Sequence, residues 1–446
     1  MDKKKSKLNF KNKITNFSEI KKRIFFLIFS LIIFRLGSFI PIPGVDTGSL
    51  SKILKDQHGS MIEMFNVFSG GSLNRASIFS LGIMPYISSS IIIQLLTFIY
   101  PSWKELQKEG ESGRIKINQY TKFLTVFISF LQAIGISLSV PNLPGMKSLI
   151  FHIDFYFYII AVVSLVTGTI FLIWIGDLIT EYGLGNGISV IIFSGIISNL
   201  PSAIINTLEE LRIKNLSLIN FLIIIILIFS IIYLVVFIER SQRKIIINYS
   251  NRRHNGYFNS FKNSSYLPLK INMSGVIPAI FASSVVLFPI TLISWFKENI
   301  LDKNSWCNFI FLNLQPGQPI YIFIYTFLII FFCFFYTNLA FNSRETSDNL
   351  KKSGAFIQGV RPGENTSNYI KKIMFKLTFI NTIYIVFICL LPEFMRKMIN
   401  VPFYFGGTSL LIVVVVIIDL ISQLQTLLLS KQYKLSFKRA NLNLKK

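Results

Sequence analysis

The chain has 446 residues, of which 52% are hydrophobic, 15% aromatic and 15% charged. Soluble domains carry about 25% charged residues, so this composition argues against a water-soluble fold, and 44 phenylalanines exclude a disordered or collagen-like chain. A polytopic membrane protein remains, and the net charge of +24 indicates basic loops facing the cytoplasm and anionic lipids. Nucleic-acid binding competes as an interpretation, but the basic residues are scattered between apolar segments.

Apolar segments long enough to cross a bilayer recur along the chain. A helix needs about 20 residues to span the hydrocarbon core. The first segment follows a basic N-terminal tail and has no small-residue cleavage pattern, so we expect it to be retained. The sequence predicts ten spans, at 24–41, 77–99, 123–140, 155–176, 186–206, 218–238, 272–295, 318–340, 373–392 and 404–426.

The distribution of Lys and Arg predicts the orientation of these spans. One side carries 33 of the 45 basic residues and the other 10, while Arg35 and Lys376 fall within spans, from which they can snorkel to the interface. Both termini are therefore predicted to be cytoplasmic, as an even number of spans requires.

The spans divide into two sets of five, and an odd set size inverts the second half relative to the first. The predicted fold class is thus an all-α membrane protein built from two inverted halves. The predicted organisation is a basic tail (1–23), an N-terminal half (24–207), an external connection (208–217), a C-terminal half (218–426) and a second basic tail (427–446).

One segment cannot span as a single helix. MIEMFNVFSGGSLNRASIF, at 61–79, is apolar but is interrupted by Gly70, Gly71, Asn74 and Arg75. A half-helix inside a cavity and an amphipathic helix on the outer surface are both compatible with it.

Isoleucines recur four residues apart, and therefore on one helix face, in two spans: Ile83 with Ile87, and Ile188 with Ile192. Taken alone, these are ordinary core or lipid-facing residues.

Two spans contain helix-weakening or polar residues. Pro85 and serines 88–90 are expected to weaken the second span, and Pro278 with Pro289 to kink the seventh. Gln94, Ser283 and Ser284 could bond across a helix interface or to their own backbone.

Two loops, about 240–270 and 342–372, are longer than a simple connection requires. The second contains GAFIQGVRPGENT, in which Gly359, Pro362 and Gly363 predict turns that present Arg361 at a loop tip. A solvated arginine or one facing lipid headgroups is the alternative interpretation.

Signatures of enzymes are missing from the sequence. It has no Walker motif, no nucleophile elbow and no local metal motif among its three histidines, so we predict no enzyme, no cofactor and no metal site. The three cysteines are too few for a disulfide scaffold and are expected to be packing residues. Asp419 is the only carboxylate within a predicted span, which disfavours an ion-coupled transporter.

Long strings spread from about Ile20 to Tyr433 carry a family resemblance. They include FRLGSFIPIPG, FNVFSGGSLNRASIF, LGIMPYISSSIIIQLL, KINMSGVIPAIFASS, GAFIQGVRPGENT and VPFYFGGTSLLIVVVVIIDLISQLQT. These strings closely resemble the bacterial SecY family of protein-translocation channels. The resemblance implies a ten-helix clamshell around an hourglass pore, in the bacterial inner membrane.

The resemblance also implies roles for individual residues. A pore ring is implied at Ile83, Ile87, Ile188, Ile192, Ile280 and Ile412. A re-entrant plug is implied at about 62–72, including Phe65, Asn66, Phe68, Gly70 and Gly71, which favours the cavity half-helix. A lateral gate is implied along spans two and seven, with Pro85, Gln94, Pro278, Ser283 and Ser284 as candidates.

Partners are implied as well. The two long loops resemble those that dock the ribosome and the SecA motor ATPase, with Arg252, Arg253, Arg361 and Tyr433 as candidate contacts. The loop around Arg252 lacks the family's usual glycine followed by paired arginines, and Lys434 stands where an acidic residue often follows the tyrosine. Further implied partners are the small subunits SecE and SecG, SecDF, YidC, signal sequences, unfolded polypeptides and anionic lipids.

We therefore predict a channel that passes unfolded polypeptides across the membrane and inserts membrane proteins laterally. The alternative is an ion-coupled secondary transporter of small solutes, and a third class is an intramembrane enzyme. The aliphatic ring and the scarcity of buried carboxylates favour the channel.

Overall fold

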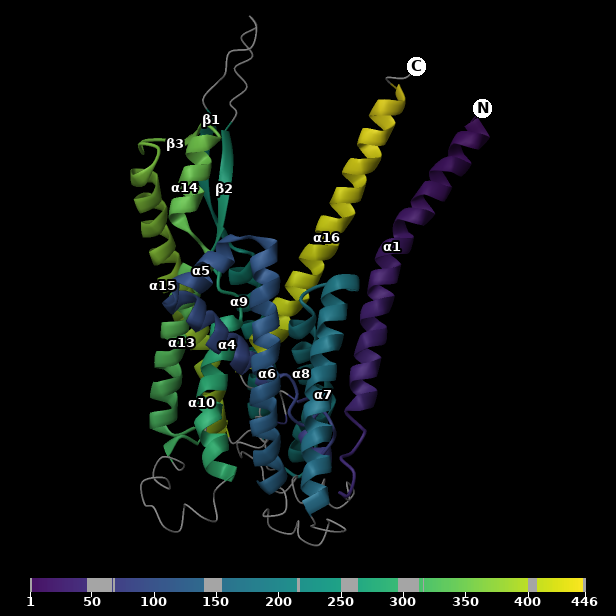
Figure 1. Ribbon diagram of the computed structural model, residues 1–446, viewed down its shortest axis with the longest axis vertical. Coiled ribbons are helices and arrows are strands. Elements are labelled where there is room, and N and C mark those ends of the chain that lie inside the picture. The colour runs from purple at the N-terminus through teal and green to yellow at the C-terminus, as the bar shows by residue number, and fades with distance from the viewer. Residues whose placement is uncertain are drawn as a thin grey trace, which may run out of the picture.

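The computed structural model describes residues 2–45, 66, 69–139, 155–214, 217–249, 264–295, 313–315, 317–399 and 407–443. Long helices run roughly along one direction, and a small sheet lies at one end of them (Figure 1). In chain order the elements are α1 (Asp2–Gly37), η1 (Leu73–Arg75), α4 (Met84–Ile99), α5 (Pro101–Lys108), α6 (Glu111–Ser139), α7 (Phe155–Tyr182), α8 (Gly187–Arg212), α9 (Leu218–Arg240), β1 (Gln242–Tyr249), β2 (Ser264–Lys270), α10 (Ile277–Trp295), α13 (Pro319–Ala340), α14 (Ser343–Lys352), β3 (Ala355–Ile357), α15 (Glu364–Ile399) and α16 (Gly407–Asn443).

Every predicted span overlaps one long helix. Among the described residues, seven helices are individually long and apolar enough to cross a bilayer, and α4 with α5 forms a further pair bent by 106°. The remaining two spans correspond to α1 and to α10, whose apolar stretch is Ile277–Pro289. Large apolar side chains such as Phe123, Phe155 and Phe323 are exposed on the outside of the bundle, as expected for contact with lipid.

The second span begins later than the sequence predicted. The helix starts at Met84 rather than at residue 77, because residues 77–83 form turns and their backbone bonds to another segment. Ile78 N donates to Ile40 O at 3.0 Å, and Ile42 N donates to Ala76 O at 2.8 Å. The turns lie so close to α7 that a Cβ atom on Gly168 would be 2.2 Å from Ile78 O.

The expectation that Pro85 and Pro278 weaken or kink their helices was wrong. Each is the second residue of its helix, α4 or α10, where the missing N–H has no intrahelical partner to lose. Pro289 lies inside α10, so it is the proline of that helix that can bend it.

The two long loops fold into secondary structure that the sequence analysis did not predict. Their strands form one antiparallel sheet in the order β2-β1-β3, with Ile247 aligned to Ile357. Ile245 and Ile247 of β1 are buried, whereas Ile246 between them is exposed. This alternation is the two-residue period of a strand with one covered face, and the covered face packs on α15 through Ile370, Ile373 and Leu377.

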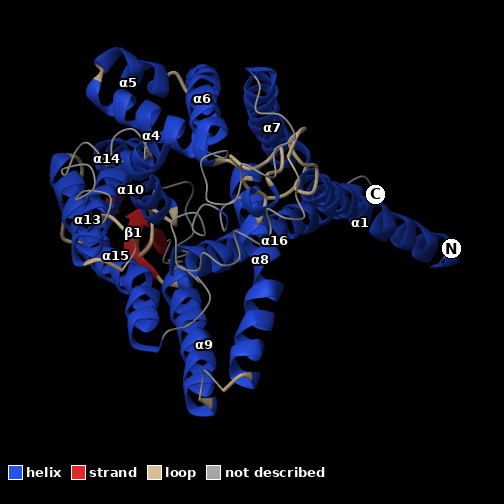
Figure 2. Cartoon of the chain, turned by 90° about the horizontal axis from the view of Figure 1, so that it is seen from below, coloured by secondary structure: helices blue, strands red, loops and turns tan. Residues whose placement is uncertain are grey.

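The helices pack in two groups, which Figure 2 shows along the bundle. In one group α6 packs on α4 and α7, while α1 and α8 pack on α7; in the other, α13 packs on α10 and α15, and α16 packs on α9 and α15. The groups meet along two seams, α10 against α4 and α6, and α16 against α8. Both terminal helices, α1 and α16, project at the end that carries the sheet (Figure 1).

Candidate functional site

All six predicted isoleucines belong to, or pack against, one large apolar cluster that joins helices of both groups. Ile83 caps the start of α4 and Ile87 lies in its first turn; α8 contributes Ile188 and Ile192, α10 contributes Ile280, and α16 contributes Ile412. Ile83, Ile87, Ile192 and Ile412 are buried in one hydrophobic cluster, and Ile188 and Ile280 are half-buried against it. The helices that carry these residues belong to both groups and include members of both seams. We call these six residues the isoleucine cluster.

The chemistry of the isoleucine cluster is purely aliphatic. Such side chains cannot replace the hydration shell of an ion, and a narrow aliphatic constriction favours dewetting. The arrangement can therefore resist ions at the junction of the two helix groups and still yield if the groups part.

The described part of the predicted plug is a tight turn. Gly70 and Gly71 have φ angles of +72° and +81°, a region that suits glycine. Gly71 N donates to Asn66 O at 2.9 Å, and Asn74 N donates to Asn66 Oδ1 at 3.2 Å. Phe65 and Phe68 lie outside the described residues.

Side chains from two helices hold this turn. Arg35 Nη1 of α1 donates to Gly70 O at 3.1 Å, and Ser198 Oγ of α8 donates to the same oxygen at 3.0 Å. Asn199 Nδ2 donates to Asn66 O at 3.3 Å. We call Arg35, Ser198 and Asn199 the clasp.

The clasp was missed from the sequence. Arg35 was interpreted as a residue that can snorkel to the membrane interface and needs no functional role. The structure adds a specific contact, because its guanidinium donates to Gly70 O and lies 5.0 Å from the centre of the Phe39 ring. The sequence did contain one signal of a specific contact, which is the presence of an arginine inside an apolar span.

The candidate gate residues lie on or near the α4–α10 seam. Pro85, Pro278, Ser283 and Ser284 are buried, and Gln94 is half-buried. The serine hydroxyls both donate to Ile280 O, at 2.8 and 2.9 Å, which settles the open alternative in favour of local backbone bonding. Gln94 Nε2 likewise bonds within α4, to Ser90 Oγ at 3.1 Å.

Two of the candidate docking residues are exposed at the end of the molecule that carries the sheet and the termini. Arg361 lies between Gly359 and Gly363, whose φ angles are +80° and +103°, and Thr366 Oγ1 bonds its carbonyl oxygen at 2.8 Å. Tyr433 of α16 is 67% exposed. Arg252 and Arg253 lie outside the described residues.

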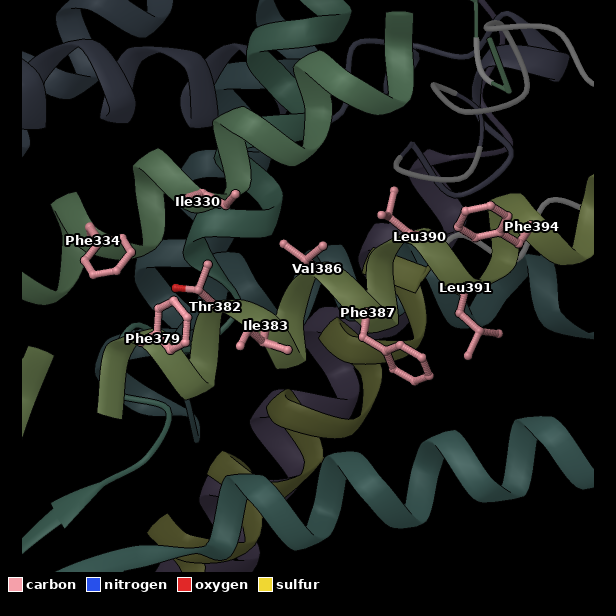
Figure 3. Close-up of a pocket in the computed structure, with 10 residues that line it drawn as sticks. All are labelled: Ile330, Phe334, Phe379, Thr382, Ile383, Val386, Phe387, Leu390, Leu391 and Phe394. Atoms are coloured by element: carbon pink, nitrogen blue, oxygen red, sulfur yellow. The ribbon is translucent and has the colours of Figure 1, made fainter. Parts of the chain in front are cut away.

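A separate apolar groove of about 490 Å³ lies between α13 and α15 (Figure 3). Its lining side chains include Phe334, Phe379 and Phe387, with Thr382 as the polar exception. Such a lining offers little to recognise a charged or polar solute.

Within the described ranges no group of three or more His, Cys, Asp and Glu side chains could hold a metal ion. Cys333 and Cys389 are buried free thiols in the core, whereas Cys307 lies outside those ranges.

Comparison with known proteins places the chain among close relatives. The family model described as SecY matches residues 77–421. The chain is 62% identical to the protein translocase subunit SecY of Buchnera aphidicola subsp. Schizaphis graminum, over 99% of this chain and 100% of the relative. It is 56% identical to the subunit of that name from Escherichia coli K12, over 98% of both chains.

Solved structures share the fold at low sequence identity. A structure described as that of a protein conducting channel matches with a TM-score of 0.67 and 16% identity, over 92% of this chain and 93% of the other. Sec61 in a canine ribosome-channel complex from the endoplasmic reticulum matches with a TM-score of 0.64 and 16% identity, over the same shares.

Proposed function

Because the chain belongs to the SecY family of protein translocase subunits, we propose how its described residues conduct a polypeptide. The chain is a multi-pass membrane protein and the channel subunit of a protein translocase. We propose that an unfolded chain crosses the membrane through the isoleucine cluster, which acts as the pore ring. The single observation that carries this proposal is that these six aliphatic side chains, from helices of both groups, lie in or against the same apolar cluster.

The ring would seal by apolar packing and yield by side-chain motion. Ile412 is 1% exposed, so no water column passes its side chain in this packed state. Aliphatic side chains carry no directional bonds, and they can therefore repack around any sequence that enters.

The plug turn adds a second barrier in this proposal. The clasp ties the turn to α1 and α8, which belong to one helix group. A translocating chain would displace the plug by breaking these few hydrogen bonds, each worth about 0.5–1.5 kcal/mol, or about 1.5–3 where arginine takes part.

The α4–α10 seam is the proposed lateral gate. Two inverted halves, 24–207 and 218–426, would hinge near 208–217, which comprises the end of α8 and its connection to α9, and part along this seam. Support comes from the packing, since in the described part of the chain the main contacts of α10 with the other group are those with α4 and α6. An apolar signal helix would favour the parted state because it replaces the contacts that α4 and α10 lose to each other.

The end with the sheet is the proposed cytoplasmic docking surface. We place this end, with both termini, in the cytoplasm of a bacterium, and the helices in its inner membrane. Arg361 and Tyr433 would contact the ribosome or SecA, together with Arg252 and Arg253, and these partners would supply the energy for transport. SecE and SecG would be companion subunits, SecDF and YidC further partners, and the basic loops would bind anionic lipids.

Photo-crosslinking tests this proposal. A photoreactive amino acid is placed at successive positions of a secretory chain stalled in the full translocase in membrane vesicles. We expect the signal-sequence probe to label α4 and α10, and a probe in the translocating segment to label the isoleucine cluster. Labelling confined to the lipid-facing sides of α9 or α15 would contradict the proposed path.

A further inference from the structure

A chain of buried polar side chains joins three parts of the molecule beneath the sheet. Asn381 Nδ2 of α15 donates to Ser274 Oγ at 3.0 Å, and Ser274 Oγ donates to Asn272 Oδ1 at 3.2 Å. Asn272 Nδ2 then donates to Glu239 Oε2 at the end of α9, at 2.8 Å. All four are buried, with Asn381 1% and Glu239 7% exposed.

These hydrogen bonds restrict the geometry of the region that they join. A buried hydrogen-bonded network holds one geometry, because removing a member leaves its partners without bonds in a low-dielectric interior. The Glu239 carboxylate also interacts electrostatically with Lys270 of β2 and Asp419 of α16. The polar chain therefore fixes the segment between β2 and α10 against α9 and α15.

The sheet belongs to the same fixed body. Ile271 N donates to Ser241 O at 3.2 Å, and Gln242 pairs with Lys270 where β1 and β2 meet α9 and the polar chain. On its covered face, Leu269 and Ile245 pack with Ile373 of α15. The described part of the sheet is thus joined by direct hydrogen bonds and packing to the segment that holds Asn272 and Ser274.

The next residue, Gly275, ends the polar chain, and its carbonyl oxygen accepts a bond from Asn272 Nδ2 at 3.3 Å. Gly275 has a φ of +60°, and a Cβ atom there would meet nothing within 4 Å. Two residues later α10 begins; it packs on α13 of its own helix group and on α4 and α6 of the other group. The conformational freedom of glycine in open space makes this position a natural pivot.

We propose that Glu239, Asn272, Ser274 and Asn381 are positioning residues that anchor the gate helix α10 to the docking surface, with Gly275 as its pivot. The proposal rests on the proposed function, because it assumes that α10 moves when a partner binds. In it, partner binding shifts the sheet, the polar chain transmits the shift, and α10 swings away from α4.

A distance measurement tests the anchor. Spin labels are attached to cysteines replacing the exposed Ile92 of α4 and Phe288 of α10, in the full chain with its companion subunits in nanodiscs and with the native cysteines replaced. The label-to-label distance is measured before and after adding a ribosome that carries a nascent secretory chain. Co-sedimentation gives the affinity for the ribosome.

The variants distinguish a loss of coupling between the docking surface and α10 from misfolding and from a loss of ribosome binding. Glu239→Leu and Asn381→Ala break the polar chain, whereas Glu239→Gln keeps an acceptor oxygen for Asn272. Thr378→Val is the matched control, since this buried α15 hydroxyl donates to Met374 O of its own helix, at 2.9 Å. Ser274→Ala replaces either breaking variant if that variant does not fold.

We expect the breaking variants to bind the ribosome within about twofold of the unmodified affinity while the distance increase falls to about half or less. Glu239→Gln and Thr378→Val keep the full increase. Three results would overturn the anchor. The breaking variants could keep the full distance increase, Glu239→Gln could lose that increase as well, or the breaking variants could lose affinity for the ribosome. If the label-to-label distance does not increase in the unmodified protein, the proposed gate is contradicted, and the anchor with it.

Discussion

In the proposed pore ring, individual side chains set how tightly the channel is sealed. Ile192 and Ile412 lie on helices of different groups and are both buried in the isoleucine cluster. Replacing each by glycine removes four carbons and opens a space that can hold water.

We therefore predict that the double variant Ile192→Gly, Ile412→Gly has a raised resting ion conductance in planar bilayers. Ile224→Gly in α9 is the control, because it removes an equally buried isoleucine that lies outside the cluster. Each such substitution costs about 2–5 kcal/mol of stability, so a conductance that rises equally in the control would assign the leak to general destabilisation and contradict the ring.

The clasp gives a second prediction at the residue scale. Arg35→Met removes a charge-assisted hydrogen bond to the plug turn, worth about 1.5–3 kcal/mol, so the displaced plug should become about tenfold more populated or more. Arg23→Met is the matched control, since Arg23 Nη1, earlier in α1, makes the same kind of bond to Gly183 O at 3.2 Å. Accessibility of a cysteine at Ser69 to a soluble thiol reagent measures the population. Equal labelling of both variants would contradict the role of Arg35.

Some of these residues could be predicted from the sequence and others could not. The four-residue spacing within α4 and α8 placed Ile83 with Ile87, and Ile188 with Ile192, but Ile280 and Ile412 followed only from the family resemblance. Glu239 lies one residue beyond the predicted span 218–238, so the sequence assigned it to the loop that follows. Its partner Asn272 and the distant Asn381 are joined by contacts between segments far apart in the chain, which no local pattern encodes.

At the scale of elements, the turns before α4 depend on close backbone approach. A Cβ atom at Gly168 of α7 would be 2.2 Å from Ile78 O, whereas one at Gly176 of the same helix would meet Ile188 and Ile191 atoms at 3.3 Å or more. We predict that Gly168→Ala lowers the free energy of unfolding by about 1–3 kcal/mol and that Gly176→Ala changes it less. Loss of helical circular dichroism on heating the purified full chain measures both, and equal midpoints would contradict the packing.

The elements were predicted unevenly for physical reasons. Long apolar runs identified the helices because the bilayer requires them, and Pro85 was misjudged because the start of its helix depends on backbone bonds between residues 76–78 and 40–42. The strands β1 and β2 are short, and residues 250–263 between them lie outside the described part of the chain. The strands pack on α15, so the alternation of Ile245, Ile246 and Ile247 was a weak signal by itself.

At the scale of the whole molecule, the sheet and both termini lie at one end (Figure 1), and the α8–α9 connection is predicted to lie outside the cytoplasm. Single cysteines at Ile213 and Tyr433 offer a balanced comparison, because these side chains are 65% and 67% exposed. In intact spheroplasts, a membrane-impermeant maleimide should label Ile213→Cys and leave Tyr433→Cys unlabelled until the cells are lysed. The reverse pattern would invert the orientation that the basic residues predict.

Disulfide trapping tests whether a polypeptide passes through the isoleucine cluster. A secretory chain with one cysteine in its translocating segment is stalled in the translocase that carries Ile412→Cys, with Ile224→Cys as the comparison. Oxidation should link the stalled chain to position 412 and not to position 224. A stalled chain that never forms a bond at 412, at any position of its cysteine, would contradict passage through the isoleucine cluster.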